Sequence, residues 1–255
     1  MTSRTIPEPV QRQVRQDCGF GCVICGAPIF TYDHIDEFSI TQSHESSNIA
    51  LLCYNHHMEK TAKRLSKDVV KKYRASPHNK MRKSKGIHTW ILQGNSVEFR
   101  IGNNVFGSPA MSDGEKYVAI NFMEMEIFSV RREGDNLLVS IFINDIEGNQ
   151  VLKIIDNEMI LGENLWDFDF SGTRMKIRSL SNPKRVINFE FNPNTSVIYI
   201  SESRFRIDYP RFAALNPFEN YREIRIEKDL TVILPSNTII SGFHCYVGRI
   251  GMRIV

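Results

Sequence analysis

The chain has 255 residues, enough for two domains with their own hydrophobic cores, and its 42% apolar and 24% charged residues are typical of a globular protein. We expect no membrane span, because no run of about 18 apolar residues occurs, and no secretory signal, because the N-terminus lacks an apolar stretch. The net charge of +3 excludes no class of partner. Residues 1–90 carry fourteen basic and eight acidic side chains, whereas the remainder carries eighteen and twenty-one.

The first part of the chain alternates short apolar segments with glycine-rich and polar ones. After a loose N-terminal arm, a short helix is expected over residues 10–17, where Val10 and Val14 are four residues apart. Residues 29–35 and 49–52 are expected to be strands, joined by a polar loop with the sequence TQSHESS.

Four metal-binding side chains form two pairs with the same spacing. Two residues separate Cys22 from Cys25, and two separate Cys53 from His56. Structural zinc binds four sulfur or nitrogen ligands in a tetrahedron, so we assign these four residues to one Zn²⁺ ion. A rival first pair, Cys18 and Cys22, has three residues between its members. Thiols arranged as metal ligands favour a reducing, cytoplasmic setting.

Two histidines and an aspartate beside these pairs suit the hydrolysis of a phosphodiester. That reaction needs a base to activate water and a cation to neutralise charge on the phosphate. Neutral imidazole is well suited to be the base near pH 7, and Asp33, next to His34, offers a hard oxygen ligand for Mg²⁺ or a similar ion. His56 and His57 are adjacent, about 100° apart on a helix, which suits one ligand for each of two sites. His44 has no supporting pattern, and we interpret it as a solvated loop histidine, with a contact to substrate as the alternative.

The first part of the chain contains the runs GFGCVICG, YDHI and NIALLC, followed by two adjacent histidines and by Lys60 and Thr61. Taken together, this pattern resembles the zinc-bearing HNH endonucleases of the ββα-metal fold. The resemblance covers residues 12–64, about a fifth of the chain. One variation is that His56 stands where many members of that family carry a fourth zinc cysteine.

The resemblance implies a role for each of four residues. By this likeness His34 is the general base, and Asp33 and His57 hold a single catalytic ion, Mg²⁺ or Mn²⁺. Asn48 looks like the residue that clamps the loop carrying the base, through hydrogen bonds from its side chain to the backbone.

A basic helix is expected after the second strand. It should begin near Asn55 or His56 and run toward Tyr73, with Leu65, Val69 and Tyr73 as one apolar stripe. Between residues 60 and 85 there are eleven Lys or Arg and one acid, a density that indicates a polyanionic partner, DNA. The candidate nucleic-acid-binding residues are Lys60, Lys63, Arg64, Lys67, Lys71 and Lys72.

Residues 87–255 read differently, with short alternating runs such as VEFRI, LLVSIFI and VIYIS that predict an all-β domain. The sequences EGDN at 133–136 and IEGN at 146–149 lie between such runs, as hairpin turns do. Very short apolar runs and frequent glycines near the C-terminus leave a β-sandwich and a β-solenoid as alternatives. So many strands expose edges, so we expect this domain to pair with a second copy or another chain.

The whole sequence predicts an α+β protein. An N-terminal ββα-metal (HNH) zinc domain over 1–76 is followed by a basic linker over 77–86 and a larger, mostly antiparallel all-β domain over 87–255. We interpret the chain as a metal-dependent DNA endonuclease, in a two-part layout that suits restriction or anti-phage defence. The alternatives are a zinc-stabilised nucleic-acid-binding protein without catalysis and an oligomeric β scaffold with an inactive HNH head. The complete catalytic set favours the endonuclease, because binding alone needs no base.

Overall fold

The computed structural model separates the chain into two compact units, residues 1–88 with 167–170 (the first unit) and residues 89–166 with 171–255 (the second unit). The residues that it describes are 4–81, 88–89, 91–122, 125–145, 147–183, 187–206, 223–233, 239–242, 244–245 and 250–254. Residues 82–87 of the expected linker lie outside this description.

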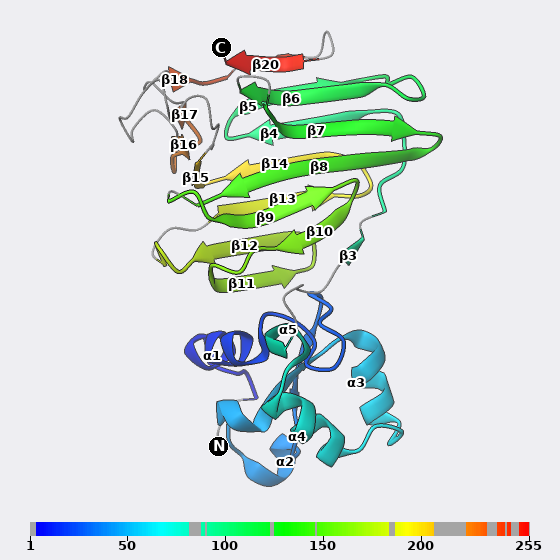
Figure 1. Cartoon of the computed structure of the whole chain (residues 1–255), viewed down its shortest axis with the longest axis vertical. Coiled ribbons are helices and arrows are strands. Elements are labelled where there is room, and N and C mark those ends of the chain that lie inside the picture. The colour runs from blue at the N-terminus through cyan, green and yellow to red at the C-terminus, as the bar shows by residue number, and fades with distance from the viewer. Residues whose placement is uncertain are drawn as a thin grey trace. The chain divides into compact units, whose positions relative to one another are not determined.

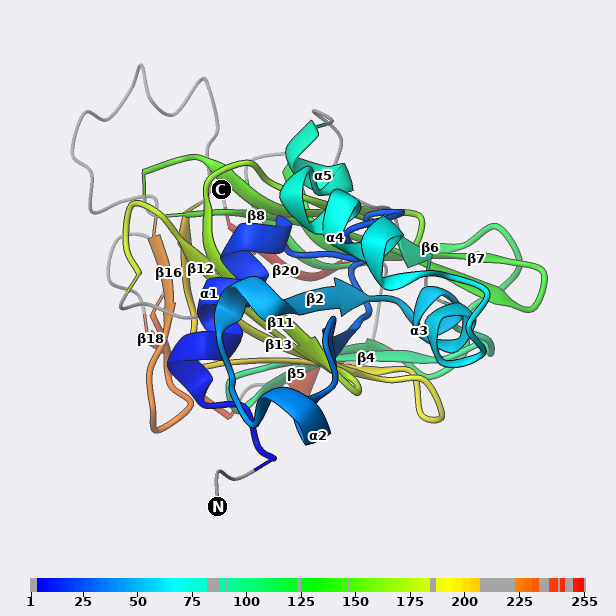
Figure 2. The same cartoon turned by 90° about the horizontal axis from the view of Figure 1, so that it is seen from below.

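A two-stranded antiparallel hairpin forms the centre of the first unit. Strand β1 (Thr31–His34) pairs with β2 (Ile49–Leu52). Helix α1 (Glu8–Cys18) lies on one side of the hairpin and α3 (Tyr54–Thr61) on the other (Figure 1, Figure 2). All of β2 is buried, whereas β1 is partly exposed, so β1 presents side chains at the surface of the unit.

The hydrophobic core of the first unit joins α1, the hairpin and one residue of a later helix. Its side chains are apolar and lose their contact with water, which stabilises the unit by about 25 cal/mol for each Å² of apolar surface buried. They are Val14, Cys18, Cys22, Val23, Ile35, Ile49, Ala50, Leu51, Leu52 and Val70.

The basic helix expected between residues 55 and 73 is two helices, so this prediction is wrong. Helix α3 ends at Thr61, and α4 (Lys67–Ala75) begins after a loop. Lys63 has a left-handed φ of +62°, which a continuous helix does not allow. Ser66 then caps α4, because its side chain accepts a hydrogen bond from the Val69 amide at 3.3 Å.

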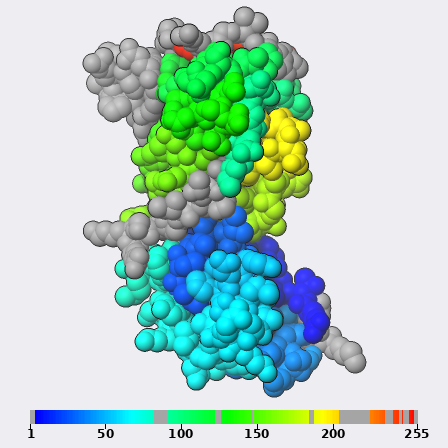
Figure 3. Space-filling model, turned by 90° about the vertical axis from the view of Figure 1, so that its right-hand side faces the viewer, coloured from blue at the N-terminus to red at the C-terminus, as the bar shows by residue number. Residues whose placement is uncertain are grey.

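The predicted apolar stripe is also wrong. Val69 and Tyr73 are each 39% exposed, and the buried residue of α4 is Val70. No residue of α3 is buried, and the cyan segment that contains this helix covers much of the first unit's face in the space-filling view (Figure 3).

The segment expected as a linker begins with a helical turn, α5 (His78–Met81), that is anchored in the first unit. Asn79 is buried and donates hydrogen bonds to the carbonyl oxygens of Gly19 at 3.0 Å and Gly26 at 3.1 Å. Gly26 has φ of +78°, and a Cβ atom there would lie 2.2 Å from Oδ1 of Asn79. Glycine is therefore required where α5 closes over this turn.

The second unit is predominantly β, as expected. In the described part of the chain one sheet has eleven strands and the other seven. The strands of the larger sheet are β3 (His88–Thr89), β6 (Lys116–Phe122), β7 (Met125–Glu133), β8 (Asn136–Asn144), β9 (Gln150–Ile155), β10 (Glu158–Leu161), β15 (Arg204–Arg206), β16 (Glu223–Ile226), β17 (Val232–Ile233), β18 (Ile239–Ile240) and β20 (Ile250–Ile254). The smaller sheet has β4 (Val97–Ile101), β5 (Asn104–Ser108), β11 (Leu165–Ser171), β12 (Arg174–Ser179), β13 (Ile187–Asn192), β14 (Val197–Ser201) and β19 (His244–Cys245).

The two sheets of the second unit lie face to face (Figure 1). Phe99 of β4 and Phe128 of β7 are fully buried, with ring centroids 6.2 Å apart. Most strand pairs among the described residues are antiparallel, but β14 with β4, β19 with β5 and β20 with β6 are parallel. The turn expected at 133–136 is confirmed, because it joins β7 to β8 through Gly134 at φ of +58°. None of the helices in the described ranges has the length and apolar character needed to cross a membrane.

A buried carboxylate connects loops of the second unit. Asp145 follows β8 and accepts hydrogen bonds from the side chains of Ser181, Asn149 and Asn164. Burial acts to raise the pKa of Asp145, but these hydrogen bonds outweigh it and hold the pKa below its ordinary value. The carboxylate is therefore ionised at neutral pH and keeps the loops together.

Candidate active site and metal centre

Cys22, Cys25, Cys53 and His56 form a cluster that can hold a metal ion such as zinc. The Sγ atoms of Cys25 and Cys53 are 3.8 Å apart. Nδ1 of His56 lies 3.4 Å from Sγ of Cys22 and 3.2 Å from Sγ of Cys53. Zinc bonds of about 2.3 Å to sulfur and about 2.0 Å to nitrogen give tetrahedral separations of about 3.8 Å between sulfurs and about 3.5 Å between sulfur and nitrogen. The donor atoms therefore fit one tetrahedral ion.

The structure decides between the two cysteine pairs that the sequence offered. Cys18 is buried in α1, and burial raises the pKa of its thiol to about 11, so the thiol stays protonated at neutral pH. Within the cluster, the neighbouring Cys25 thiol lowers the pKa of Cys22 to about 4. The ligand atoms of Cys22, Cys25, Cys53 and His56 lie within 4.8 Å of one another, and Cys18 is not among them, so the structure groups Cys22 with Cys25.

A pocket of about 980 Å³ opens beside β1 and α3, and we call it the active-site pocket. Neighbours on a regular strand point to opposite faces, but β1 ends at His34, and both Asp33 and His34 line this pocket. His57 joins them from the first turn of α3, with its Nε2 atom 3.5 Å from Oδ1 of Asp33. The adjacent His56 belongs instead to the cysteine cluster, so the two neighbouring histidines serve different sites.

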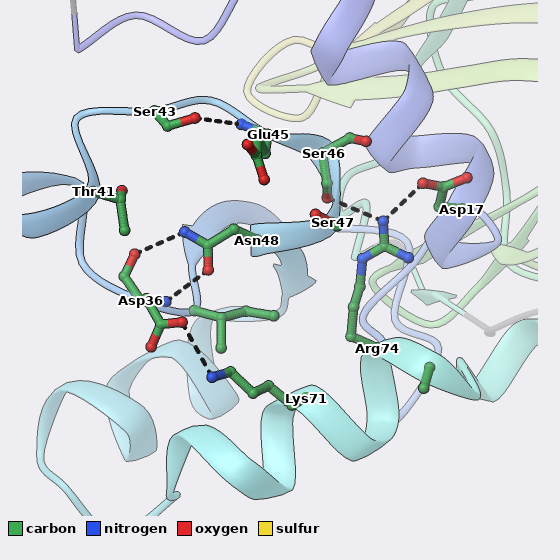
Figure 4. Close-up of a pocket in the computed structure, with 12 residues that line it drawn as sticks. Asp17, Asp36, Thr41, Ser43, Glu45, Ser46, Ser47, Asn48, Lys71 and Arg74 are labelled. Carbon is green, nitrogen blue, oxygen red and sulfur yellow. Dashed lines mark hydrogen bonds and ion pairs between the residues drawn. The ribbon is translucent and has the colours of Figure 1, made fainter.

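Asn48 holds the chain that follows His34. Its Oδ1 atom accepts a hydrogen bond from the Asp36 amide at 2.9 Å, and its Nδ2 atom donates to the Asp36 carbonyl oxygen at 3.0 Å (Figure 4). Its own carbonyl oxygen accepts from the Ile35 amide at 2.8 Å. Asn48 closes the 3₁₀ helix η1 (Ser46–Asn48) and lines a second pocket, of about 760 Å³. Three hydrogen bonds thus join the ends of the loop between β1 and β2.

Lys60 enters the active-site pocket from α3, one turn after His57. Its Nζ atom donates to Oδ2 of Asp33 at 2.5 Å and to the carbonyl oxygen of His34 at 2.6 Å. The side chain is only 12% exposed. The sequence suggested Lys60 as a nucleic-acid contact, but in this structure its charge is directed at Asp33.

The loop between β1 and β2 also brings a second histidine to His34. Nδ1 of His44 lies 3.2 Å from Nε2 of His34. The His44 ring stacks on Phe38 of α2 (Phe38–Thr41), with centroids 4.7 Å apart and planes 13° from parallel. The interpretation of His44 as a solvated histidine is therefore wrong. No periodicity links residues 34 and 44, so only the folded loop reveals the contact.

His34 has the protonation state that a general base needs. Burial lowers the pKa of His34 below its ordinary value, and His44 and Lys60 lower it further, while Asp33 acts in the opposite direction. The imidazole is therefore neutral at pH 7 and can accept a proton from water.

Acidic residues from elsewhere in the first unit pair with much of the expected basic surface. The window from 60 to 85 contains one acid, but the partners of its paired cations lie at positions 17–59. Lys63 and Lys72 make no ion pair with any other described residue and are exposed. The ion pairs are Lys60–Asp33, Arg64–Glu59, Lys67–Glu37, Lys67–Asp36, Lys71–Asp36 and Arg74–Asp17.

Two cations line the active-site pocket and have no ion pair among the described residues. One is Lys63, from the loop after α3, and the other is Arg4, from the N-terminal arm. Arg4 was not a candidate from the sequence, because a single arginine in a loose arm carries no pattern. Together they leave the pocket with positive charge available to an anionic ligand.

Comparison of the chain with protein-family models, curated proteins and solved structures gave no match. Function is therefore inferred from the residues and the geometry of the site.

Proposed function

We propose that the first unit is a metal-dependent endonuclease of the HNH type that hydrolyses phosphodiester bonds in DNA. The observation that carries the proposal is the position of Asn48, which holds both polar groups of the Asp36 backbone while Asp33, His34 and His57 line one pocket. A surface that only binds an anion needs neither a neutral imidazole nor a clamped loop beside it. The strand, strand, helix order of β1, β2 and α3 agrees with the ββα-metal fold that the resemblance implies.

His34 is the proposed general base. Its neutral imidazole takes a proton from water as the water oxygen attacks phosphorus, a contribution of roughly 10²–10⁴-fold to the rate. Arg4 and Lys63 on the pocket wall attract the phosphate backbone. Asn48 keeps His34 in place by holding the chain immediately after it.

Asp33 and His57 would hold the catalytic ion. The 3.5 Å between Oδ1 and Nε2 is compatible with two ligands at about 2.1 Å from one ion, and a single carboxylate leaves positions free for phosphate oxygens. The Lys60 ammonium already lies against Asp33, so these oxygens suit a cation. When bound, Mg²⁺ or Mn²⁺ neutralises the charge that develops on the phosphate.

Plasmid cleavage tests the proposed function. Purified protein with its zinc content verified is incubated with supercoiled DNA and Mg²⁺, Mn²⁺ or a chelator added at the start of the assay. We expect nicking or linearisation only with the metal ion, and a loss of roughly 10²–10⁴-fold in His34→Ala. His78→Ala, a histidine outside both pockets, should cut like the wild type.

The same assay identifies the main alternative. If zinc-loaded wild-type protein binds DNA but cuts it under none of these conditions, the first unit is a zinc-stabilised binding module. The proposed biological setting, restriction or anti-phage defence, rests on the two-part layout of the chain and becomes testable once cleavage is established.

A further inference from the structure

The two ring nitrogens of His34 have different surroundings. Nε2 lies 3.2 Å from Nδ1 of His44, and no described residue forms a hydrogen bond with Nδ1 of His34. A neutral imidazole carries one proton, so one of its nitrogens donates and the other accepts. The direction of the hydrogen bond between the two histidines therefore decides which lone pair is left to act on water.

One direction of this hydrogen bond leaves neutral His34 without a free lone pair, and the other direction leaves it with one. If His44 donated to Nε2 of His34, the proton of neutral His34 would be on Nδ1, and no free lone pair would remain. If His34 donates through Nε2–H, its Nδ1 atom keeps a lone pair. The second arrangement is the only one of the two that lets His34 activate water without moving.

We propose that His44 is a positioning residue that accepts a hydrogen bond from Nε2–H of His34 and so keeps Nδ1 as the base. The inference rests on the proposed nuclease function, which it deepens. During attack, one proton of water goes to Nδ1 of His34, and the oxygen that loses it bonds to phosphorus. The bond from phosphorus to the leaving sugar oxygen breaks, and that oxygen keeps the bonding pair and takes a proton from solvent water. The resulting imidazolium still donates through Nε2–H to His44, so no further proton acceptor is required.

The surrounding loop orients the ring of His44 for this role. Phe38 stacks on His44 at 4.7 Å and also contacts the His34 ring, with centroids 5.3 Å apart. Gln42 ends α2 with a left-handed φ of +50°, which turns the chain and brings residue 44 back. Asn48 fixes the backbone after His34, whereas His44 contacts its ring, so the two residues restrain different parts of the same base.

Two substitutions at one position separate hydrogen bonding from packing. His44→Phe keeps an aromatic ring for the stack on Phe38 but has no acceptor. His44→Asn loses the ring but carries an amide oxygen on the branch where His44 has Nδ1. Cleavage of plasmid gives kcat and KM for each full-length variant. Nitrogen-15 spectra of histidine-labelled, zinc-loaded protein without Mg²⁺ or Mn²⁺ at pH 7.5 report which nitrogen of His34 is protonated, with His34→Gln used to assign the signal.

We expect wild-type His34 to be protonated at Nε2, and His44→Phe to lose this preference. Its kcat should fall about 10–100-fold with KM within about twofold, while His44→Asn should stay within about fivefold of the wild-type kcat. Protonation of wild-type His34 at Nδ1, full activity of His44→Phe, or equal losses in the two variants would each overturn the inference. The spectra do not depend on enzymatic activity, so they decide the direction of the hydrogen bond even if the wild-type protein does not cut DNA. A wild-type protein that does not cut DNA would refute only the nuclease proposal.

Discussion

The ammonium group of Lys60 lies 2.5 Å from Oδ2 of Asp33. It also donates to the carbonyl oxygen of His34, so a positive charge already contacts two oxygens beside the proposed metal ligands. Two cations on one carboxylate repel each other, more strongly at a partly buried site than in water. An ion bound at Oδ1 of Asp33 would therefore compete with the Lys60 ammonium at Oδ2, and a phosphate in the pocket would offer the amine another partner.

Replacing Lys60 by methionine should strengthen metal binding in the absence of DNA. The variant keeps a side chain of similar length but removes the competing charge. We expect the dissociation constant for Mn²⁺, measured by calorimetry on zinc-loaded protein, to fall at least about tenfold, which corresponds to about 1.4 kcal/mol.

Two further variants serve as controls for Lys60. Lys60→Arg keeps the charge and should not tighten Mn²⁺ binding, and Asp33→Asn should abolish the tight binding in the Lys60→Met background. Unchanged or weaker Mn²⁺ binding by Lys60→Met would show that the ammonium does not compete with the ion.

Loss of a cluster cysteine should unfold the first unit alone. Structural zinc contributes roughly 10–16 kcal/mol in small zinc modules, more than a unit of this size can lose. Cys53→Ser should therefore lack zinc by elemental analysis, and hydrogen exchange should be fast over residues 4–81 but unchanged in the second unit. Cys18→Ala, a buried cysteine outside the cluster, should retain one zinc ion per chain. Zinc-free wild-type protein with a protected first unit would contradict the assignment.

Lys63 and Lys72 are a matched pair for testing the DNA-binding surface. Both are exposed lysines without an ion pair among the described residues, but only Lys63 lines the active-site pocket. In Lys63→Gln we expect weaker binding to all DNA sequences. The slope of log K against log salt should also be smaller by about 0.9, as for one lost phosphate contact. Lys72→Gln should leave both unchanged, and equal effects of the two changes would place the DNA on a broader surface.

Asp145 should stabilise the second unit in a pH-dependent way. Asp145→Asn puts an amide among side chains that donate to the carboxylate, so we expect a loss of about 1–3 kcal/mol in unfolding free energy at pH 7. The pKa of Asp145 is lowered on folding, so its contribution is present above the ordinary pKa of about 3.9 and lost as pH falls through the lower folded value. Denaturation curves of wild type and variant should therefore converge in acid. Asp135→Asn, in the exposed β7–β8 turn, should have little effect at either pH.

Local patterns in the sequence determined the features that depend on neighbouring residues. Spacing alone paired Cys22 with Cys25 and Cys53 with His56, because metal ligands on one turn must be a few residues apart. Alternation of apolar and polar side chains located most strands, including β4 (Val97–Ile101) with the expected ends, because the side-chain period of a strand is two residues.

Tertiary structure alone determined the contacts between residues that an irregular loop brings together. The left-handed backbone at Lys63 breaks a segment whose composition reads as one helix. The acids that pair with the basic helices, and the approach of His44 to His34, come from residues distant in sequence or joined through an irregular loop. Such contacts follow from the closure of the loop between β1 and β2, which has no periodic pattern for a sequence to display. The residue types therefore predicted the candidate site, whereas tertiary packing determined which residue lies against each charge and each imidazole nitrogen.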